Sequence, residues 1–133
     1  MSVKYGSNEL LNTILSGSDD GSVRLWDIRS GQQIQEFNGH TDVVNAVEYS
    51  PFVIKNNSDN SNVICSGSND TTIRFWDVRS NKSELHAMKV NGMVFCLKLI
   101  ELKKVNKNEQ NANNNICINL CYGLNNGSIN IWG

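Results

Sequence analysis

The cysteines and histidines that characterise transition-metal and redox sites are few, namely four cysteines and two histidines. Cys65, Cys96 and Cys117 lie inside apolar, β-branched runs, and Cys121 follows Cys117 by four residues in a strand-like segment. Metal and redox sites usually pair cysteines at Cys-x-x-Cys spacing or combine them with histidines, and neither pattern occurs in this sequence. We therefore expect buried free thiols, with no metal site and no cofactor.

Catalytic patterns are also missing from the sequence. It has no Gly-rich phosphate loop that opens a helix, and no carboxylate pair outside turn positions. His86 lies in a polar strand with no carboxylate or thiol at a recognisable spacing, which predicts a solvated side chain. We expect that the protein is not an enzyme.

Length, charge and hydropathy narrow the class of protein further. A chain of 133 residues is one small domain or part of a larger one. Twelve Lys and Arg balance thirteen Asp and Glu, so no overall field favours nucleic acid or an anionic membrane. No apolar run is long enough to span a membrane, and residues 1–20 lack signal-peptide features. We expect a cytoplasmic or nuclear protein that is not secreted.

Internal repetition is the strongest signal in the sequence. Residues 16–30 read SGSDDGSVRLWDIRS and residues 66–80 read SGSNDTTIRFWDVRS, with nine of fifteen positions identical. A more divergent third copy occupies residues 122–132. Upstream of these copies, residues 94–99 match residues 44–49. Because such repeats mark repeated structural units, the chain is expected to fold as a series of similar modules.

Each copy contains short segments in which apolar and polar residues alternate. Residues 11–15 and 62–65 predict one type of strand, and residues 22–27 and 72–77 predict another. An Asp-Gly pair between the two strand types of the first copy indicates a tight hairpin turn. The pattern predicts an all-β fold.

The repeats resemble those of the WD40 β-propeller family. Gly39-His40, Ser-Gly-Ser-x-Asp and Trp-Asp occur together, in the family's order and at its spacing, and the resemblance covers nearly the whole chain outside two insertions. It implies four-stranded antiparallel blades, of which about 4–8 normally circle a central channel. Here it implies a partial propeller of about three blades, both terminal ones incomplete, with cores near residues 1–37, 38–90 and 91–133.

The resemblance also implies a buried polar network. In the family, a Ser ten residues before the Trp and an Asp six residues before it join the Gly-His histidine and the indole. The middle repeat has all four members: His40, Ser66, Asp70 and Trp76. The first repeat has three of them: Ser16, Asp20 and Trp26. The third has Tyr122 and Asn126 at the Ser and Asp positions and Val90 in place of the histidine. Losing one member of a complete network would leave a buried polar group unpaired, at a cost of roughly 1–3 kcal/mol.

A serine, a histidine and an aspartate in one network are also the residue types of a hydrolase triad. A nucleophilic serine needs an exposed Oγ and an oxyanion hole. Ser66 instead follows the apolar pair Val63-Ile64 in a strand that repeats as Leu15-Ser16. We therefore expect these residues to lock a blade together, and no catalytic residue is predicted.

Two Asn-rich insertions, residues 55–62 and 103–115, extend the repeats beyond the family's length of about 40–45 residues. Both are too polar to bury, and they are expected to be disordered. Lys103, Lys104 and Lys107 form a small basic cluster in the second insertion, without aromatic residues that could stack on bases. A solvated tether is expected there in preference to a nucleic-acid site.

The family resemblance implies a protein–protein interaction scaffold that binds through the rim of Gly-His and hairpin-turn loops. The family's contact positions lie three and five residues after the histidine and immediately before the turn Asp. In this chain they are Val43, Asn45, Met93, Phe95, Asp19, Asn69 and Asn125. Met93 and Phe95 are the most suggestive, because adaptable and aromatic apolar groups anchor many interfaces. The alternative is that these two side chains pack against a neighbouring blade.

Two other function classes remain open. One is a self-assembling structural module, and the other is an RNA- or ribosome-associated WD-repeat protein, favoured only by the lysines of the second insertion. Three repeats fall short of the usual minimum of about four blades. We expect a fragment of a longer propeller or an incomplete open arc, with self-association through open blade edges as the alternative.

Overall fold

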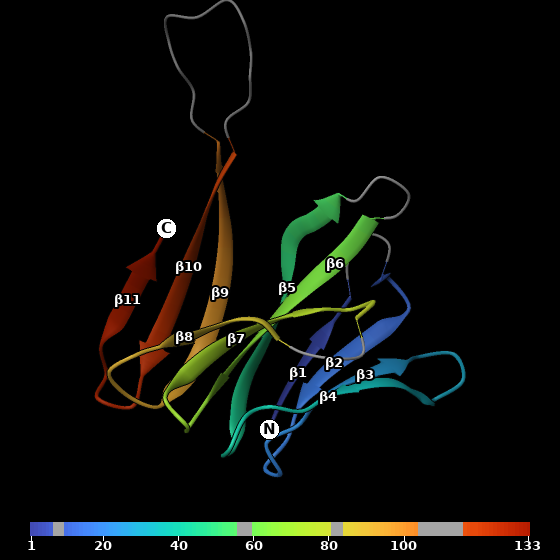
Figure 1. The fold of residues 1–133 in the computed structure, drawn as a ribbon, viewed down its shortest axis with the longest axis horizontal. Coiled ribbons are helices and arrows are strands. Elements are labelled where there is room, and N and C mark those ends of the chain that lie inside the picture. Colours follow the sequence, from blue (N-terminus) through green and yellow to red (C-terminus); the bar gives the residue numbers. More distant parts are fainter. Residues whose placement is uncertain (7–9, 56–59, 81–83, 104–115) are drawn as a thin grey trace, which may run out of the picture.

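The computed structural model describes residues 1–6, 10–55, 60–80, 84–103 and 116–133. Within them the chain forms eleven β-strands in three antiparallel sheets, two of four strands and one of three (Figure 1). In each sheet, strands that follow one another in the sequence are neighbours. The predicted all-β fold with three blades is confirmed. The described segments include no helix long and apolar enough to cross a membrane.

Blade 1 comprises β1 (Ser2–Tyr5), β2 (Thr13–Gly17), β3 (Val23–Asp27) and β4 (Gln33–Phe37). All four strands are therefore present, although β1 has only 4 residues, whereas β5 of the next blade has 12. The hairpin between β2 and β3 turns at Gly21, whose φ of 83° is easily reached by glycine. This is the Asp-Gly turn expected from the sequence.

Blade 2 comprises β5 (Val44–Lys55), β6 (Asn60–Ser68), β7 (Thr72–Asp77) and β8 (Glu84–Lys89). The first insertion is narrower than predicted, because β5 and β6 continue their ladder as far as the pair Lys55 and Asn60. Residues 56–59, which complete the insertion, lie outside the described residues.

Blade 3 comprises β9 (Val94–Lys103), β10 (Ile116–Leu124) and β11 (Ile129–Trp132). It has three strands, as expected for an incomplete last blade. The second insertion joins β9 to β10, and residues 104–115, with two of the three clustered lysines, lie outside the described part of the chain. The expected disorder of this insertion stays a prediction.

The strand predicted at residues 11–15 begins two residues later in the structure. The Thr13 hydroxyl donates to the Leu10 carbonyl at 2.8 Å, and the Thr13 carbonyl accepts from the Gly6 N–H at 2.9 Å. These bonds hold the segment before Thr13 in a turn, which leaves Leu11 66% exposed. Its apolar character suggested a strand, but the local hydrogen bonding favours the turn.

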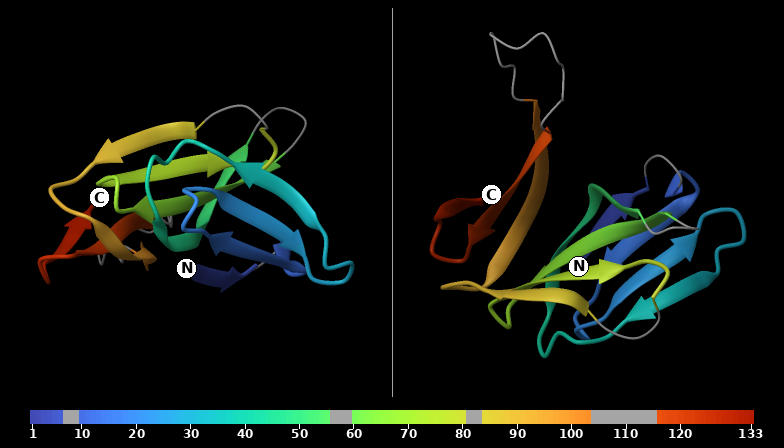
Figure 2. Two further views of the ribbon diagram at one scale, coloured as in Figure 1. Left: turned by 90° about the horizontal axis from the view of Figure 1, so that it is seen from below. Right: turned by 45° about the horizontal axis from the view of Figure 1, so that its top comes forward.

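The three blades are arranged side by side with blade 2 in the middle, as two further views also show (Figure 2). Their first strands adjoin one another, since β5 contacts both β1 and β9. Glu48 of β5 joins them electrostatically, with its Oε2 atom 3.3 Å from Lys4 Nζ and 3.8 Å from Lys98 Nζ. These ion pairs link one carboxylate of blade 2 to both flanking blades.

Two hydrophobic cores fill the spaces between the blades. The core between blades 1 and 2 consists of Leu15, Val23, Leu25, Phe37, Val44, Val47, Tyr49, Ile64 and Trp76. The core between blades 2 and 3 consists of Ala46, Cys65, Ile73, Val90, Val94, Leu97, Leu120 and Leu124. Full burial of one large apolar side chain stabilises a fold by about 1.5–3 kcal/mol, so packing between blades is a main source of stability.

Two glycines allow consecutive blades to approach closely. A Cβ atom added to Gly17 would lie 2.6 Å from Val44 Cγ1, and one added to Gly67 would lie 2.4 Å from Val94 Cγ1. Both separations are far shorter than van der Waals contact, so a side chain at either glycine would force the two blades apart.

Candidate functional site

The polar residues singled out in the middle repeat meet in a buried network under the loops of blade 2. His40 comes from the segment between β4 and β5, Ser66 from β6, and Asp70 from the turn between β6 and β7. His40 Nδ1 lies 2.8 Å from Asp70 Oδ2, and His40 Nε2 lies 2.7 Å from Ser66 Oγ. The Trp76 indole N–H of β7 donates to the same Ser66 Oγ at 2.9 Å. The structure thus brings all four residues together.

The directions of these hydrogen bonds follow from the chemistry of the groups. An indole can only donate and a carboxylate can only accept, so Ser66 Oγ accepts from Trp76 and donates its own proton to His40 Nε2. His40 then carries its proton on Nδ1 and donates it to Asp70. Every member has the partner that it needs when the imidazole is neutral, as a buried network requires.

The local environment sets the ionisation states of His40 and Asp70. Burial of the His40 ring lowers its pKa below the ordinary value of 6.5, and this outweighs the opposite effect of Asp70. Burial by itself would raise the pKa of Asp70, but hydrogen bonds from Thr72, His40 and the Thr41 amide bring it to about 2. Because the imidazole is neutral, the contact is a hydrogen bond to a carboxylate and not an ion pair.

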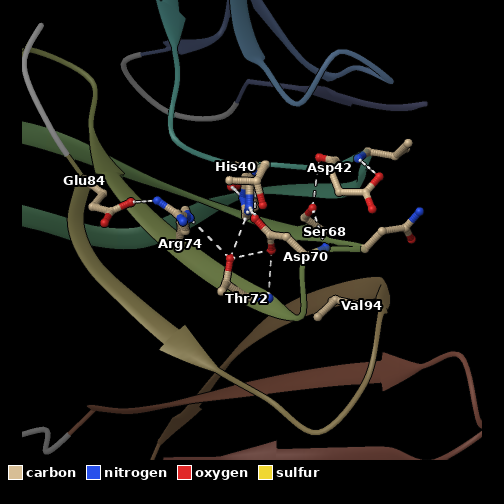
Figure 3. A network of polar contacts seen from close by, with 12 residues as sticks. His40, Asp42, Ser68, Asp70, Thr72, Arg74, Glu84 and Val94 are labelled. Atoms are coloured by element: carbon tan, nitrogen blue, oxygen red, sulfur yellow. Dashed lines mark hydrogen bonds and ion pairs between the residues drawn. The ribbon is translucent and has the colours of Figure 1, made fainter.

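Thr72 extends the network beyond the residues that the sequence singled out. Its hydroxyl donates to Asp70 Oδ1 at 2.6 Å and lies 3.2 Å from His40 Nδ1 (Figure 3). Arg74 Nε donates to Thr72 Oγ1 at 3.2 Å, and the Arg74 guanidinium pairs with Glu84 of β8. The network therefore runs from the buried indole across the blade to its outer strand.

The sequence contains a signal for the role of Thr72. A hydroxyl residue follows the turn Asp or Asn by two positions in each repeat, and its Oγ lies 2.6 Å from the Asp or Asn side-chain oxygen. The three pairs are Asp20 with Ser22, Asp70 with Thr72, and Asn126 with Ser128.

The contacts of Ser66, His40 and Asp70 have the connectivity of a hydrolase triad, but Ser66 lacks access to a substrate. It is 0% exposed, and its Oγ already accepts the Trp76 N–H. A nucleophilic serine must present its Oγ to a carbonyl carbon beside an oxyanion hole. The arrangement suits a structural lock between loop and strand.

Blade 1 contains only part of such a network. The Trp26 indole donates to Ser16 Oγ at 2.9 Å, which repeats the Trp76–Ser66 contact. Asp20 is directed elsewhere and accepts bonds from Ser22 and from Arg24 Nη2, the latter at 2.5 Å. Hydrogen bonds from Ser22, followed by Arg24, lower the pKa of Asp20.

Blade 3 replaces the network with apolar packing. Val90, at the histidine position, is buried in the core between blades 2 and 3, and Tyr122 packs against the same core. Trp132 is 54% exposed, in contrast with the buried Trp76. Asn126 bonds locally to Ser128.

The predicted rim residues of blade 2 connect it to blade 3. Asn45 Nδ2 donates to Asn69 Oδ1 at 2.7 Å and to the Val94 carbonyl at 3.0 Å. The Val43 carbonyl accepts the Asn69 N–H at 3.0 Å. Asn45 and Asn69 are partly buried by these contacts, so they stiffen the rim.

The predicted rim residues of blade 3 are more accessible. Met93 is 39% exposed and Phe95 is 53% exposed, while Val94 between them is fully buried. Met93 N–H donates to Asn125 Oδ1 at 3.2 Å, and its carbonyl accepts the Asn125 N–H at 3.0 Å. Phe95 thus projects from a backbone that is held on its N-terminal side by a buried valine and a hairpin.

The rim continues to blade 1. The Val44 N–H donates to the Ser18 carbonyl at 3.0 Å, which ties the first hairpin to the start of β5. Asp19, at the tip of that hairpin, is exposed, as is Asp42 of the neighbouring loop. Ser68 Oγ donates to the Asp42 carbonyl at 3.0 Å and accepts the Asp70 N–H at 3.1 Å (Figure 3).

The remaining candidate chemical groups are a histidine and the cysteines. His86 is exposed on β8, with its ring centroid 6.4 Å from that of Phe75. Cys65, Cys96 and Cys121 are free thiols, and burial raises the pKa of the Cys65 thiol. In the described ranges, no three His, Cys, Asp or Glu side chains are placed to hold a metal ion.

Three repeated antiparallel sheets that adjoin at their first strands, the middle one with a complete His–Ser–Asp–Trp network, define a partial repeat propeller. The family model of "WD domain, G-beta repeat" matches residues 1–27 and 31–77. The chain belongs to this WD40 family.

Individual similar proteins match either a short stretch or the fold. Transcription initiation factor TFIID subunit 5 of Caenorhabditis elegans is 48% identical over 40 residues, 30% of this chain and 6% of that protein. The WD40 β-propeller domain of Doa1 is 17% identical, with a TM-score of 0.66 over 98% of this chain and 36% of the other. The computationally designed Ika4 protein is 23% identical, with a TM-score of 0.62 over 98% and 62% of the two chains. At these identities the two structures show the fold alone.

The curated relatives extend well beyond the part that this chain matches. The match spans 6% of the CCR4-associated factor 4 homolog of Vanderwaltozyma polyspora and 12% of eukaryotic translation initiation factor 3 subunit I of Culex quinquefasciatus.

Proposed function

We propose that the chain is a non-catalytic protein-interaction scaffold that binds its partner through the rim of Gly-His and hairpin-turn loops. WD40 repeats typically serve as such scaffolds. The observation that carries the proposal is Phe95, an aromatic side chain 53% exposed on the rim of blade 3.

The surroundings of Phe95 favour a binding role over a packing role. Val94 is fully buried, and its carbonyl accepts the Asn45 side chain, so the backbone beside Phe95 is fixed before any partner arrives. Preorganisation lowers the entropy cost of association, and exposed aromatic rings are frequent anchors of interfaces. Met93 adds an adaptable apolar group beside it.

The rim also has a polarity that bears on the partner. Its blade 3 end has the exposed apolar side chains Met93 and Phe95 beside the exposed Asn125, whereas Asp19 and Asp42 are exposed at its blade 1 end. A partner segment with an apolar group at one end and a basic group at the other would match both ends of the rim.

The test compares Phe95→Ala with Ile34→Ala, which truncates a side chain 54% exposed on β4. Proteins captured by the wild-type chain are purified and their Kd is measured by calorimetry against each variant. We expect Phe95→Ala to weaken binding about tenfold or more with an unchanged melting temperature, and Ile34→Ala to leave the Kd unchanged. Equal affinities for Phe95→Ala and wild type would refute the proposal that the partner binds at the rim. An unfolded Phe95→Ala variant would favour the alternative that Phe95 packs against a neighbouring blade.

The compartment follows as part of the same proposal. We propose a cytoplasmic or nuclear location, which is supported by free thiols at Cys65, Cys96 and Cys121, because thiols stay reduced in those compartments.

A further inference from the structure

Each blade has two faces, which we name by their neighbours. The proximal face is turned toward the preceding blade in the sequence, and the distal face toward the following one. The interface of blades 1 and 2 shows how the two kinds of face fit together. The distal face of blade 1 presents Leu15, Val23 and Leu25, and the proximal face of blade 2 packs on it with Val47, Tyr49, Ile64 and Trp76.

The proximal face of blade 1 is open and repeats that of blade 2. Val3 lies opposite Ser16 as Val47 lies opposite Ser66, and Tyr5 lies opposite Ile14 as Tyr49 lies opposite Ile64. Ile14 lies opposite Trp26 as Ile64 lies opposite Trp76. At all five positions the residue type is the same, namely Val, Tyr, Ile, Ser and Trp. Val3 is 52% exposed, whereas Val47 is 1% exposed.

The distal face of blade 3 is open in the same way. Cys121 lies opposite Ile131 as Leu15 lies opposite Leu25, and Gly123 lies opposite Ile129 as Gly17 lies opposite Val23. Ile129 and Ile131 are 79% and 70% exposed, whereas Val23 and Leu25 are almost fully buried. The described structure therefore has at its two ends the two halves of the interface that it forms internally.

We propose that a second copy of this chain docks head to tail, with the proximal face of its blade 1 on the distal face of blade 3. A side chain of the type of Val3 or Tyr5 would then cover Ile129 and Ile131, as Val47 and Tyr49 cover Val23 and Leu25. Made twice, this contact closes two three-bladed arcs into a ring of six blades, within the usual range of about 4–8.

One polar contact can be repeated at the new interface. Inside the chain, the Tyr49 hydroxyl lies 2.9 Å from Thr13 Oγ1 across the boundary between blades 1 and 2. Tyr5 occupies the position of Tyr49, and Asn119, two residues before Cys121, occupies that of Thr13. An asparagine amide can bond a tyrosine hydroxyl, so the interface is not purely apolar.

One contact between like charges opposes the docking and makes it depend on the salt concentration. Lys4, Glu48 and Lys98 hold equivalent positions on the three first strands, and Glu48 pairs with both lysines. Across the new interface Lys98 would face Lys4 of the second copy. Because salt screens like charges, association should tighten when the salt concentration is raised from about 0.05 M to about 0.5 M.

The mass in solution is the first test, measured by sedimentation velocity at about 100 μM chain, where micromolar contacts are populated. We expect a species of twice the chain mass. Ile131→Lys on the distal face and Tyr5→Lys on the proximal face should each give monomers. Leu85→Lys, at a side chain 49% exposed on the middle blade, should leave the dimer intact.

Mixing the two interface variants separates head-to-tail docking from symmetric pairing of like faces. Ile131→Lys keeps an intact proximal face and Tyr5→Lys an intact distal face, so the mixture should form a one-to-one dimer held by one of the two contacts, while the other contact, altered on both sides, stays open. A monomeric wild type, a Tyr5→Lys variant that still dimerises, or assemblies of another size would each overturn the proposal. Dissociation by Leu85→Lys would do so as well.

A second readout guards against variants that fail to fold. Cys96 is exposed and lies opposite Gly123 on the distal face of blade 3, in a different blade from Tyr5 of the same chain. Alkylation of Cys96, followed by peptide mass spectrometry, should be about tenfold slower in the wild type than in Tyr5→Lys when about nine-tenths of the chains are paired. Equal rates, with both chains shown to be folded by circular dichroism, would contradict the docking.

Discussion

Ser66 Oγ links the indole of one strand to the imidazole of the preceding loop. It accepts from Trp76 and donates to His40, at 2.9 and 2.7 Å, in a site with no exposure to solvent. Ser16 makes only the first of these contacts, with Trp26. The two serines therefore offer a matched comparison of a complete network with a partial one.

We predict that Ser66→Ala destabilises the fold more than Ser16→Ala. The first change leaves the Trp76 N–H and His40 Nε2 without partners, at roughly 1–3 kcal/mol for each group, whereas the second orphans one partly buried indole. Urea unfolding followed by tryptophan fluorescence measures both free energies. Equal losses in the two variants would show that the histidine link contributes nothing.

Acid should weaken the fold through the same network. The pKa of His40 is lower in the folded chain than the ordinary 6.5, so the unfolded chain takes up a proton that the folded chain does not. Unfolding free energy therefore falls as pH drops below about 6.5 toward the lowered value. The pKa of Asp70, at about 2 in the folded chain against 3.8, adds a further loss below about pH 4.

This prediction is checked by urea unfolding between about pH 8 and pH 5. His40→Gln should abolish most of the slope in that window, and His86→Gln, which replaces the exposed histidine of β8, should keep it. A wild-type stability that stays flat from pH 8 to pH 5 would contradict the neutral, buried imidazole.

At the residue scale, the network could be predicted because the resemblance to the WD40 family implies it, with the Ser and Asp at set distances before the Trp and the histidine in the Gly-His pair. The role of Thr72 in the network was not predicted, because a hydroxyl beside a turn normally faces water. The ion pairs of Glu48 with its two lysines were not predicted either, because charged residues in an edge strand do not indicate where the next blade lies. Position in space decided their roles.

At the element scale, the hairpin between β6 and β7 carries a local strain that its counterparts avoid. Thr71 has a φ of 64°, a left-handed conformation that a β-branched residue rarely adopts. The residues at the same turn position in the other blades are Gly21 and Gly127, both with a φ of 83°. The turn beside the best-formed network is thus the one with the least suitable residue.

We predict that Thr71→Gly stabilises the chain by about 0.5–1 kcal/mol. Removing the strain of a non-glycine residue in the left-handed region stabilises the folded chain by about 1–3 kcal/mol. The greater conformational freedom of glycine in the unfolded chain cancels part of this gain. The reverse change, Gly21→Thr, should destabilise, because its Cβ would also lie 2.9 Å from the His40 carbonyl. A lower urea midpoint for Thr71→Gly would contradict the strain.

The strands themselves were predicted well where apolar residues alternate and less well at their ends. β3 and β7 lie within one residue of the predicted segments, since each has a tryptophan in the alternating pattern. β2 begins later than predicted because the Thr13 side chain bonds back to Leu10. Side-chain bonds of this kind to a nearby carbonyl are not visible in a pattern of hydropathy.

At the scale of the whole molecule, the repeats determine how the blades are joined, but their sequences do not reveal how the faces are exposed. The matching Val, Tyr, Ile, Ser and Trp of blades 1 and 2 can be found by alignment of the repeats. The sequence does not indicate that one set is covered by a neighbouring blade and the other is open. That difference follows from the register and order of the sheets, and it underlies the head-to-tail docking proposed above.

Gly17 and Gly67 have a consequence for the shape of any larger assembly. Each lets a valine of the next blade approach where a methyl group would collide with it. The spacing between successive blades at these two points therefore depends on the absence of a side chain. Because the same glycine recurs at the same place in two repeats, a bulkier residue at either one would separate a single pair of blades, and any larger assembly would lose its even spacing at that joint.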